Sequence, residues 1–190
     1  MANDTTHGDE LWRTDGTASG TTLVKDITPG MSSTSIYNFT AFGNALFFTV
    51  RDDTSGGYVL WKTNGTEVGT VLLVSIVPSI GGNGPNNFMA VGNRLYFVAN
   101  DGTHGDEVWA SDGTAAGTGM LKDINPGLGD GYSSSYGVLD FIAAGNLLYF
   151  KAYEPTTGYE IWKTDGSFAG TVRVTDLNPG VADGVGGIIQ

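Results

Sequence analysis

The sequence predicts an all-β protein of the β-propeller type, built from four-stranded sheets that each correspond to one repeat of roughly 48 residues. Three observations lead to this prediction. A tryptophan-containing motif recurs four times, short apolar runs rich in aromatic residues follow Gly-Asn pairs, and no window of helical length shows an apolar period of 3.6 residues. Repeats of 40 to 50 residues are typical of propellers and of helical arrays, and strand-like composition favours the propeller.

The motif is most easily followed through its tryptophans, which are separated by 49, 48 and 53 residues. An acid or amide stands three positions after each tryptophan and is followed at once by glycine. A Gly-Thr pair follows eight and nine positions after the tryptophan, and a proline seventeen positions after it. Since the four copies align over this span without a gap, they are true repeats. The tryptophans are Trp12, Trp61, Trp109 and Trp162, and the acids or amides are Asp15, Asn64, Asp112 and Asp165.

The strands are expected where apolar and aromatic residues gather between turn signals. Runs of this kind occupy residues 46–50, 95–99 and 148–152, and each follows a Gly-Asn pair that suits a tight turn. In the second repeat, the predicted strands are residues 39–42, 45–51, 58–63 and 71–76.

The repeated acid is interpreted as a turn-forming residue without a catalytic role. Asp and Asn side chains accept hydrogen bonds from backbone donors two residues further on, and glycine adopts positive φ without a clash. The tryptophans have apolar neighbours such as Leu11 and Leu60, so we expect their rings to fill the space between sheets. The alternative is that the four rings are platforms for sugars.

The four motif copies read ELWRTDGT, VLWKTNGT, EVWASDGT and EIWKTDGS. They resemble the ELWxxDGT repeat family of large bacterial extracellular proteins. The resemblance implies a propeller-like array on a secreted or surface protein, without an agreed activity. The departures are Val59, Val108, Asn64 and Ser167, and none of them removes a strand or turn signal. The turn is also similar to the Asp-box hairpin of sialidase-type propellers, although this likeness is confined to the turn.

The chain is expected to form a single domain over residues 1–190, and the ring is expected to close in one of two ways. Either the chain is an incomplete ring that closes by self-association, or it forms a small four-bladed propeller alone. We favour a homo-oligomer, because an open ring leaves unpaired strand edges. The predicted units are a leading half repeat at 1–38, full repeats at 39–87, 88–140 and 141–187, and a stub at 188–190.

Composition excludes several classes of partner. The net charge of −11 argues against nucleic acid and against an anionic membrane surface. There is no cysteine, and no apolar run approaches the ~20 residues of a membrane span. The polar start is no signal peptide, and residues 2–4 match residues 99–101 inside a repeat. We therefore expect an extracellular or cell-surface location, with the export signal outside this chain.

Calcium is the one cofactor that the sequence suggests. The loop at 101–107 holds three acids within seven residues, and the first repeat reproduces them. Oxygen ligands on a turning loop suit Ca²⁺, although the other two repeats lack these acids, and the glutamates could instead cap strand edges. His7 and His104 share one repeat position and are interpreted as loop residues. The candidate ligands are Asp4, Asp9, Glu10, Asp101, Asp106 and Glu107.

The sequence contains no nucleophile elbow, phosphate loop, dinucleotide fingerprint or zinc motif. The first functional hypothesis is therefore a non-catalytic scaffold or adhesion module. The second is a lectin, in which aromatic rings and amides bind glycans. The third is an enzyme of glycosidase type, which needs two carboxylates at a set separation, but no pair is singled out. The candidate sugar contacts are Tyr132, Tyr136, Asn83, Asn86 and Asn87.

Overall fold

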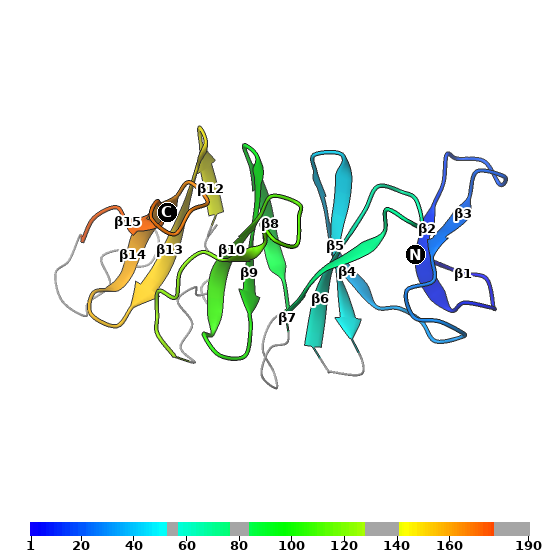
Figure 1. Cartoon of the computed structure of the whole chain (residues 1–190), viewed down its shortest axis with the longest axis horizontal. Coiled ribbons are helices and arrows are strands. Elements are labelled where there is room, and N and C mark those ends of the chain that lie inside the picture. Colours follow the sequence, from blue (N-terminus) through cyan, green and yellow to red (C-terminus); the bar gives the residue numbers. More distant parts are fainter. Residues whose placement is uncertain (53–56, 77–83, 128–140, 177–190) are drawn as a thin grey trace, which may run out of the picture.

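The computed structural model describes residues 1–52, 57–76, 84–127 and 141–176. These residues form four antiparallel sheets, and no helix occurs among them (Figure 1). The prediction of an all-β protein made from repeated sheets is confirmed. The first sheet has three strands and the other three have four strands each, always with chain neighbours side by side.

The strand bounds follow the repeat. The first sheet contains β1 (Ala2–Asn3), β2 (Asp9–Arg13) and β3 (Thr22–Lys25). The second contains β4 (Ile36–Phe42), β5 (Ala45–Asp52), β6 (Gly57–Thr63) and β7 (Val71–Ile76). The third contains β8 (Asn86–Val91), β9 (Arg94–Asn100), β10 (Asp106–Ser111) and β11 (Gly119–Met120). The fourth contains β12 (Phe141–Ala144), β13 (Leu147–Glu154), β14 (Gly158–Thr164) and β15 (Val172–Arg173).

The strands of the second sheet lie where the apolar runs predict them, with β5 and β6 each longer by one residue. The larger difference is that β4 begins three residues earlier, at Ile36. The extension passes through a bulge between Tyr37 and Thr40, where Asn38 has a φ of 56°. The third sheet repeats this bulge in β8, where Asn87 has a φ of 52°. Asparagine tolerates this backbone region better than most residues, so it suits the position.

The first sheet lacks a full second strand. Its β1 pairs Ala2 with Glu10 and Asn3 with Asp9. In the third sheet, Ala99 and Asn100 pair with the equivalent residues of β10. This shared register identifies β1 as the counterpart of the end of β9.

The sheets lie side by side along the longest axis of the molecule, with the first and fourth at opposite ends (Figure 1). The described residues therefore do not form the small four-bladed ring that was one of the two expected arrangements. Between sheets, the backbones of the first strands approach most closely, β4 to β8 and β8 to β12. The sheets thus converge along the edge that carries these strands.

Neighbouring sheets pack face to face. We call the face that carries the motif tryptophan the tryptophan face, and the other the opposite face. Phe47 and Leu60 on the opposite face of the second sheet form one core cluster with Phe97 and Trp109 on the tryptophan face of the third. A corresponding cluster joins each of the other two pairs of neighbouring sheets in the described residues. Because both faces of the inner sheets are covered, their strands are apolar on both sides.

Candidate binding clefts between the sheets

The motif after each tryptophan folds into one hydrogen-bonded turn, which we call the Asp-Gly-Thr turn. In the first sheet, the backbone N–H and the hydroxyl of Thr17 both donate to Asp15 Oδ1, at 2.9 and 2.7 Å. The Thr17 hydroxyl then accepts the N–H of Gly20 at 2.9 Å. The other three turns repeat these bonds, with Asn64, Asp112 and Asp165 as acceptors.

The glycines of the motif are required by the same turn. A Cβ on Gly20 would lie 1.9 Å from Asp15 Oδ1, so a side chain there would overlap the carboxylate. Gly16 has a φ of 92°, which L side chains rarely adopt. The hydrogen bond from Thr17 lowers the pKa of Asp15, and the pKa values of Asp112 and Asp165 are lowered in the same way. The motif acids are therefore ionised acceptors within turns.

A cation from one sheet binds a backbone carbonyl of the next sheet at each junction. Arg13 Nη1 donates to the Gly65 carbonyl at 3.1 Å, and Lys62 Nζ donates to the Gly113 carbonyl at 2.6 Å. At the third junction, Lys122 Nζ donates to the Thr171 carbonyl at 3.2 Å. We call these contacts inter-sheet bridges. Arg13 and Lys62 come directly after the tryptophan, whereas the third sheet has Ala110 there.

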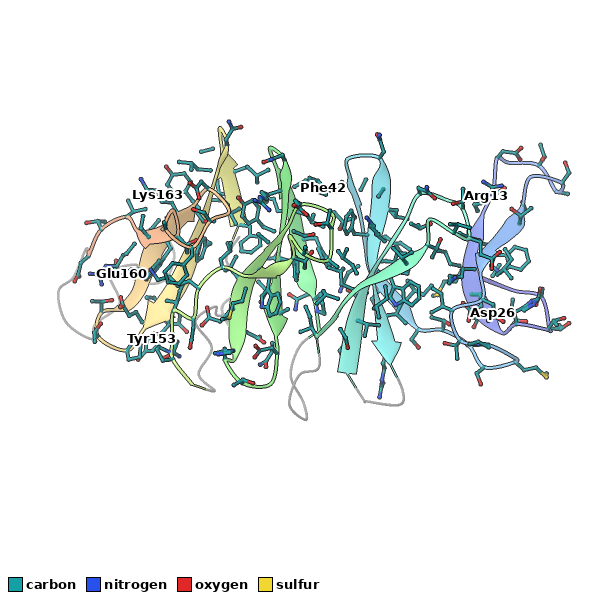
Figure 2. All side chains as sticks on the ribbon, in the orientation of Figure 1. Arg13, Asp26, Phe42, Tyr153, Glu160 and Lys163 are labelled. Carbon is teal, nitrogen blue, oxygen red and sulfur yellow. The ribbon has the colours of Figure 1, made fainter. Side chains whose placement is uncertain are left out.

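A cleft lies between each pair of neighbouring sheets in the described residues. The largest has a volume of about 620 Å³ and lies between the second and third sheets, where Phe42 is seen in Figure 2. Its polar lining includes Lys62, Asn93 and the motif residue Asp112, while Phe42 and Phe47 supply aromatic surface. The cleft thus combines a cation, an amide and a carboxylate with an apolar wall.

The other two junctions carry clefts whose lining also includes a cation, an asparagine of a Gly-Asn pair and the acid or amide of the motif. Each has a volume of about 360 Å³. Between the first and second sheets the lining includes Arg13, Asn44 and the motif residue Asn64. Between the third and fourth sheets it includes Arg94, Asn146 and the motif residue Asp165.

The acids predicted as calcium ligands have other partners. Glu10 is fully buried and accepts the N–H groups of Ile27 and Thr28, at 3.0 and 3.1 Å, together with the hydroxyl of Thr34. Glu107 likewise accepts two N–H groups, from Ile124 and Asn125. These glutamates anchor the segment that follows the last strand of their own sheet. No group of three or more acids or histidines that could hold a metal ion occurs in the described part of the chain.

Asp4 and Asp101 pair with the two histidines. Asp4 Oδ2 lies 2.7 Å from His7 Nδ1, and its other oxygen accepts the N–H groups of Thr6 and His7. Asp101 and His104 repeat this geometry at 2.7 Å. The hydrogen bond from His7 lowers the pKa of Asp4 to about 2, and Asp4 in turn raises the pKa of His7.

Two further candidate acids lie beside these loops. Asp9 is exposed, and its N–H donates to the Ser33 hydroxyl at 3.0 Å, while Asp106 is buried at the start of β10. The six candidates thus have three different roles. Two pair with a histidine, two are buried glutamates that accept backbone N–H groups, and two are the first residues of β2 and β10.

Two of the five predicted sugar contacts lie in the described residues, and both lie apart from the clefts. Asn83, Tyr132 and Tyr136 fall outside the described residues. Asn86 donates from Nδ2 to the Gly84 carbonyl at 2.8 Å, and Asn87 is the positive-φ residue of the β8 bulge. Neither lines the clefts described above. Sequence reasoning treated the Gly-Asn pairs only as turns and did not consider the cation after the tryptophan, so it missed the cleft residues.

The comparisons with known proteins concern the fold. A search against protein-family models gives no match, and neither does a search of the curated proteins. Puromycin hydrolase, as an S511A mutant complexed with PGG, matches 90% of this chain with a TM-score of 0.50 and 15% identity. A second structure of puromycin hydrolase matches 88% of the chain, with a TM-score of 0.46 and the same identity. The chain spans about a quarter of each, and the likeness extends to the fold alone.

A search for membrane-crossing segments in the described residues finds no helix with the length and apolar character to span a bilayer.

Proposed function

We propose that the chain is a non-catalytic interaction module of a secreted or surface protein, in which propeller-type sheets hold a row of binding clefts. The observation that carries the proposal is the recurrence of one polar set at three successive junctions: a cation, a motif acid or amide, and the asparagine of a Gly-Asn hairpin. Convergence of the first strands supports the propeller-type arrangement.

Repetition favours binding over catalysis. A catalytic centre depends on groups whose roles differ, such as an acid and a base with separated pKa values. The motif acids instead share one environment, since each accepts the same turn bonds and each has its pKa lowered. Several weak and equivalent clefts on one rigid array would gain affinity for a ligand that itself repeats.

The second candidate function is that of a lectin, in which the ligand of the clefts is a carbohydrate. The cleft between the second and third sheets sets the amide of Asn93 and the carboxylate of Asp112 beside the aromatic rings of Phe42 and Phe47. Sugar hydroxyl groups would bond to the amide and carboxylate, while the apolar face of the sugar ring would rest on phenyl surface.

An array that carries both glycans and short peptides tests the two proposals with the whole chain. We expect binding that weakens about tenfold, or roughly 1.4 kcal/mol, when Asn93→Ala and Lys62→Met are combined. Ligands recovered unchanged after incubation would agree with a non-catalytic role. Glu67→Ala, an exposed residue of the Asp-Gly-Thr turn region, serves as the control and leaves binding unchanged.

If the combined variant binds its ligand as tightly as the unaltered chain does, the proposal of an interaction module at these clefts is contradicted. Binding confined to peptides contradicts the carbohydrate candidate and keeps the first proposal.

A further inference from the structure

The opposite face of the fourth sheet exposes positions that are buried in every other sheet. The residue twelve positions after the tryptophan is 6% exposed in the first three sheets, as Val24, Leu73 and Leu121, but Val174 is 46% exposed. The backbone geometry is nevertheless the same. The N–H of Val174 donates to the Ile161 carbonyl at 2.8 Å, just as Leu121 donates to Val108 at 2.9 Å.

The residue before the tryptophan shows the same contrast. Leu11, Leu60 and Val108 are 5%, 0% and 1% exposed, whereas Ile161 is only half-buried. In β14, half-buried and buried residues alternate, so that Ile161 and Lys163 share one face while Trp162 lies on the other. We call the surface formed by Ile161, Lys163 and Val174 the end face.

Lys163 is the counterpart of the cations that form two of the bridges. It comes directly after Trp162, as Arg13 comes after Trp12 and Lys62 after Trp61. Arg13 and Lys62 each donate to the carbonyl of the glycine in the Asp-Gly-Thr turn of the following sheet. Figure 2 shows Lys163 on the outer side of the fourth sheet, away from the third.

The first sheet presents the matching glycine at its surface. Gly16 is exposed, whereas the equivalent glycines of the other three sheets, Gly65, Gly113 and Gly166, are half-buried. A Cβ built on Gly113 in the third sheet would lie 3.6 Å from Phe47 of the preceding sheet. A Cβ built on Gly166 in the fourth sheet would lie 3.0 Å from the Tyr96 hydroxyl of the preceding sheet.

We propose that the end face binds the first sheet of a second copy of this chain, head to tail, with Lys163 Nζ donating to the Gly16 carbonyl. The partner is a second copy because the three junctions within the chain already use this packing, and the two terminal sheets carry its two unmatched halves. Such a heterologous contact generates a ring if the rotation closes and a filament if it does not. The inference is independent of what the clefts bind.

Sedimentation of the whole chain over a range of concentrations tests the contact. We expect an oligomer for the unaltered chain and a monomer for Val174→Asp, which places a charge in the apolar end face. Lys163→Met is expected to raise the dissociation constant about fivefold, through loss of one hydrogen bond to a charged donor. Val68→Asp makes the same chemical change at a residue that is 91% exposed in a turn, and it should leave the mass unchanged.

A mixing experiment tests the direction of the contact. Thr14→Arg places a cation beside Gly16, where it would repel the incoming Lys163. Thr14→Arg and Val174→Asp should each be monomeric alone, with unchanged far-ultraviolet circular dichroism, and should form a 1:1 heterodimer when mixed. An unaltered chain that stays monomeric at every concentration would overturn the proposal. An oligomer that survives Val174→Asp, or folded variants that fail to pair on mixing, would overturn it equally.

Discussion

The junction between the second and third sheets and the junction between the third and fourth satisfy one requirement in two ways. In both, a lysine binds a backbone carbonyl of the following sheet. At the former, the lysine is Lys62 on β6, directly after the tryptophan. At the latter, the equivalent residue is Ala110, and the bond comes from Lys122, which follows β11.

The replacement brings additional contacts. Lys122 Nζ lies 5.6 Å from the ring centroid of Trp162 and 5.2 Å from that of Phe168. A cation over an aromatic face is attracted by the ring. Lys122 therefore joins the sheets both by its hydrogen bond and by its contacts with these two rings. Neighbouring sheets thus retain a bond between them, whereas the sequence position that supplies the bond can change.

The largest expected effect tests whether the apolar cores of the two junctions are equivalent. Phe97 and Phe150 pair with the tryptophans of the third and fourth sheets and are 0% and 2% exposed. Phe97→Ala and Phe150→Ala should each lower the free energy of unfolding by about 3–5 kcal/mol in urea titrations, since each leaves a cavity. A loss below ~1 kcal/mol in only one variant would show that the junctions are not equivalent.

The next effect concerns the turns that meet at these junctions. A Cβ on Gly117 would lie 2.2 Å from the carboxyl carbon of Asp112. Gly117→Ala should therefore cost about 1–3 kcal/mol, measured by thermal or urea unfolding. Adding Asp112→Ala should recover part of that loss, because it removes the clashing group. If the two losses simply add, the predicted overlap does not control the turn.

The bridges should have a smaller effect. Lys62→Met and Lys122→Met keep most of the side-chain length and remove the charged donor. We expect each to lower the free energy of unfolding by about 0.5–1.5 kcal/mol. Introducing Ala110→Lys into Lys122→Met should restore part of the loss if position 110 can supply the bridge. The absence of restoration would show that a lysine at position 110, which is buried in the core cluster of this junction, cannot supply the bridge.

The smallest expected effect concerns a difference in sequence between the third sheet and the second. The second sheet has no histidine between β5 and β6, whereas the third has His104 between β9 and β10. The hydrogen bond to Asp101 raises the pKa of His104 above its ordinary value of 6.5. A raised pKa stabilises the fold at pH values below 6.5, and this contribution is lost as the pH rises through the raised value. His104→Gln should therefore flatten the fall in melting temperature between about pH 6 and pH 8.

Asp101, in the same loop, affects stability in the acidic pH range. Burial favours a higher pKa for Asp101, but its hydrogen bonds from His104 and from two backbone N–H groups outweigh burial, so its pKa is lowered. Its contribution is present above pH 3.8 and is lost as the pH falls through the lowered value. His7→Gln makes the same change in the first sheet and should behave as His104→Gln does. A melting curve with the unaltered pH dependence in both variants would contradict this role for the histidines.

Local sequence signals predicted the parts of the structure that depend on nearby residues. The bounds of β7, for example, are those predicted from the apolar run at 71–76. The bonds to Asp15 join residues two positions apart, so residue types alone indicated that turn. The bulge at Asn38 was not predicted, because asparagine is common in ordinary turns as well.

The bridges and clefts depend on contacts between sheets, and for that reason the sequence did not reveal them. Lys62 and Gly113 are 51 residues apart, and nothing near Lys62 shows which carbonyl it meets. Glu107 illustrates a different difficulty. An acid in a loop rich in acids suits calcium, yet Glu107 accepts backbone N–H groups of residues 17 and 18 positions later. Chemistry common to two roles cannot distinguish them without the distant partner.

The face-to-face packing of sheets in a row has a consequence for how the molecule opens. Each core cluster of the described residues joins one pair of adjacent sheets, so the free energy of the array approaches a sum of nearest-neighbour couplings. In an isolated copy of this chain, opening then starts at the first or the fourth sheet and advances sheet by sheet. Amide protons of β9 and β10, which lie in a sheet coupled on both sides, exchange with solvent only after a terminal sheet has detached.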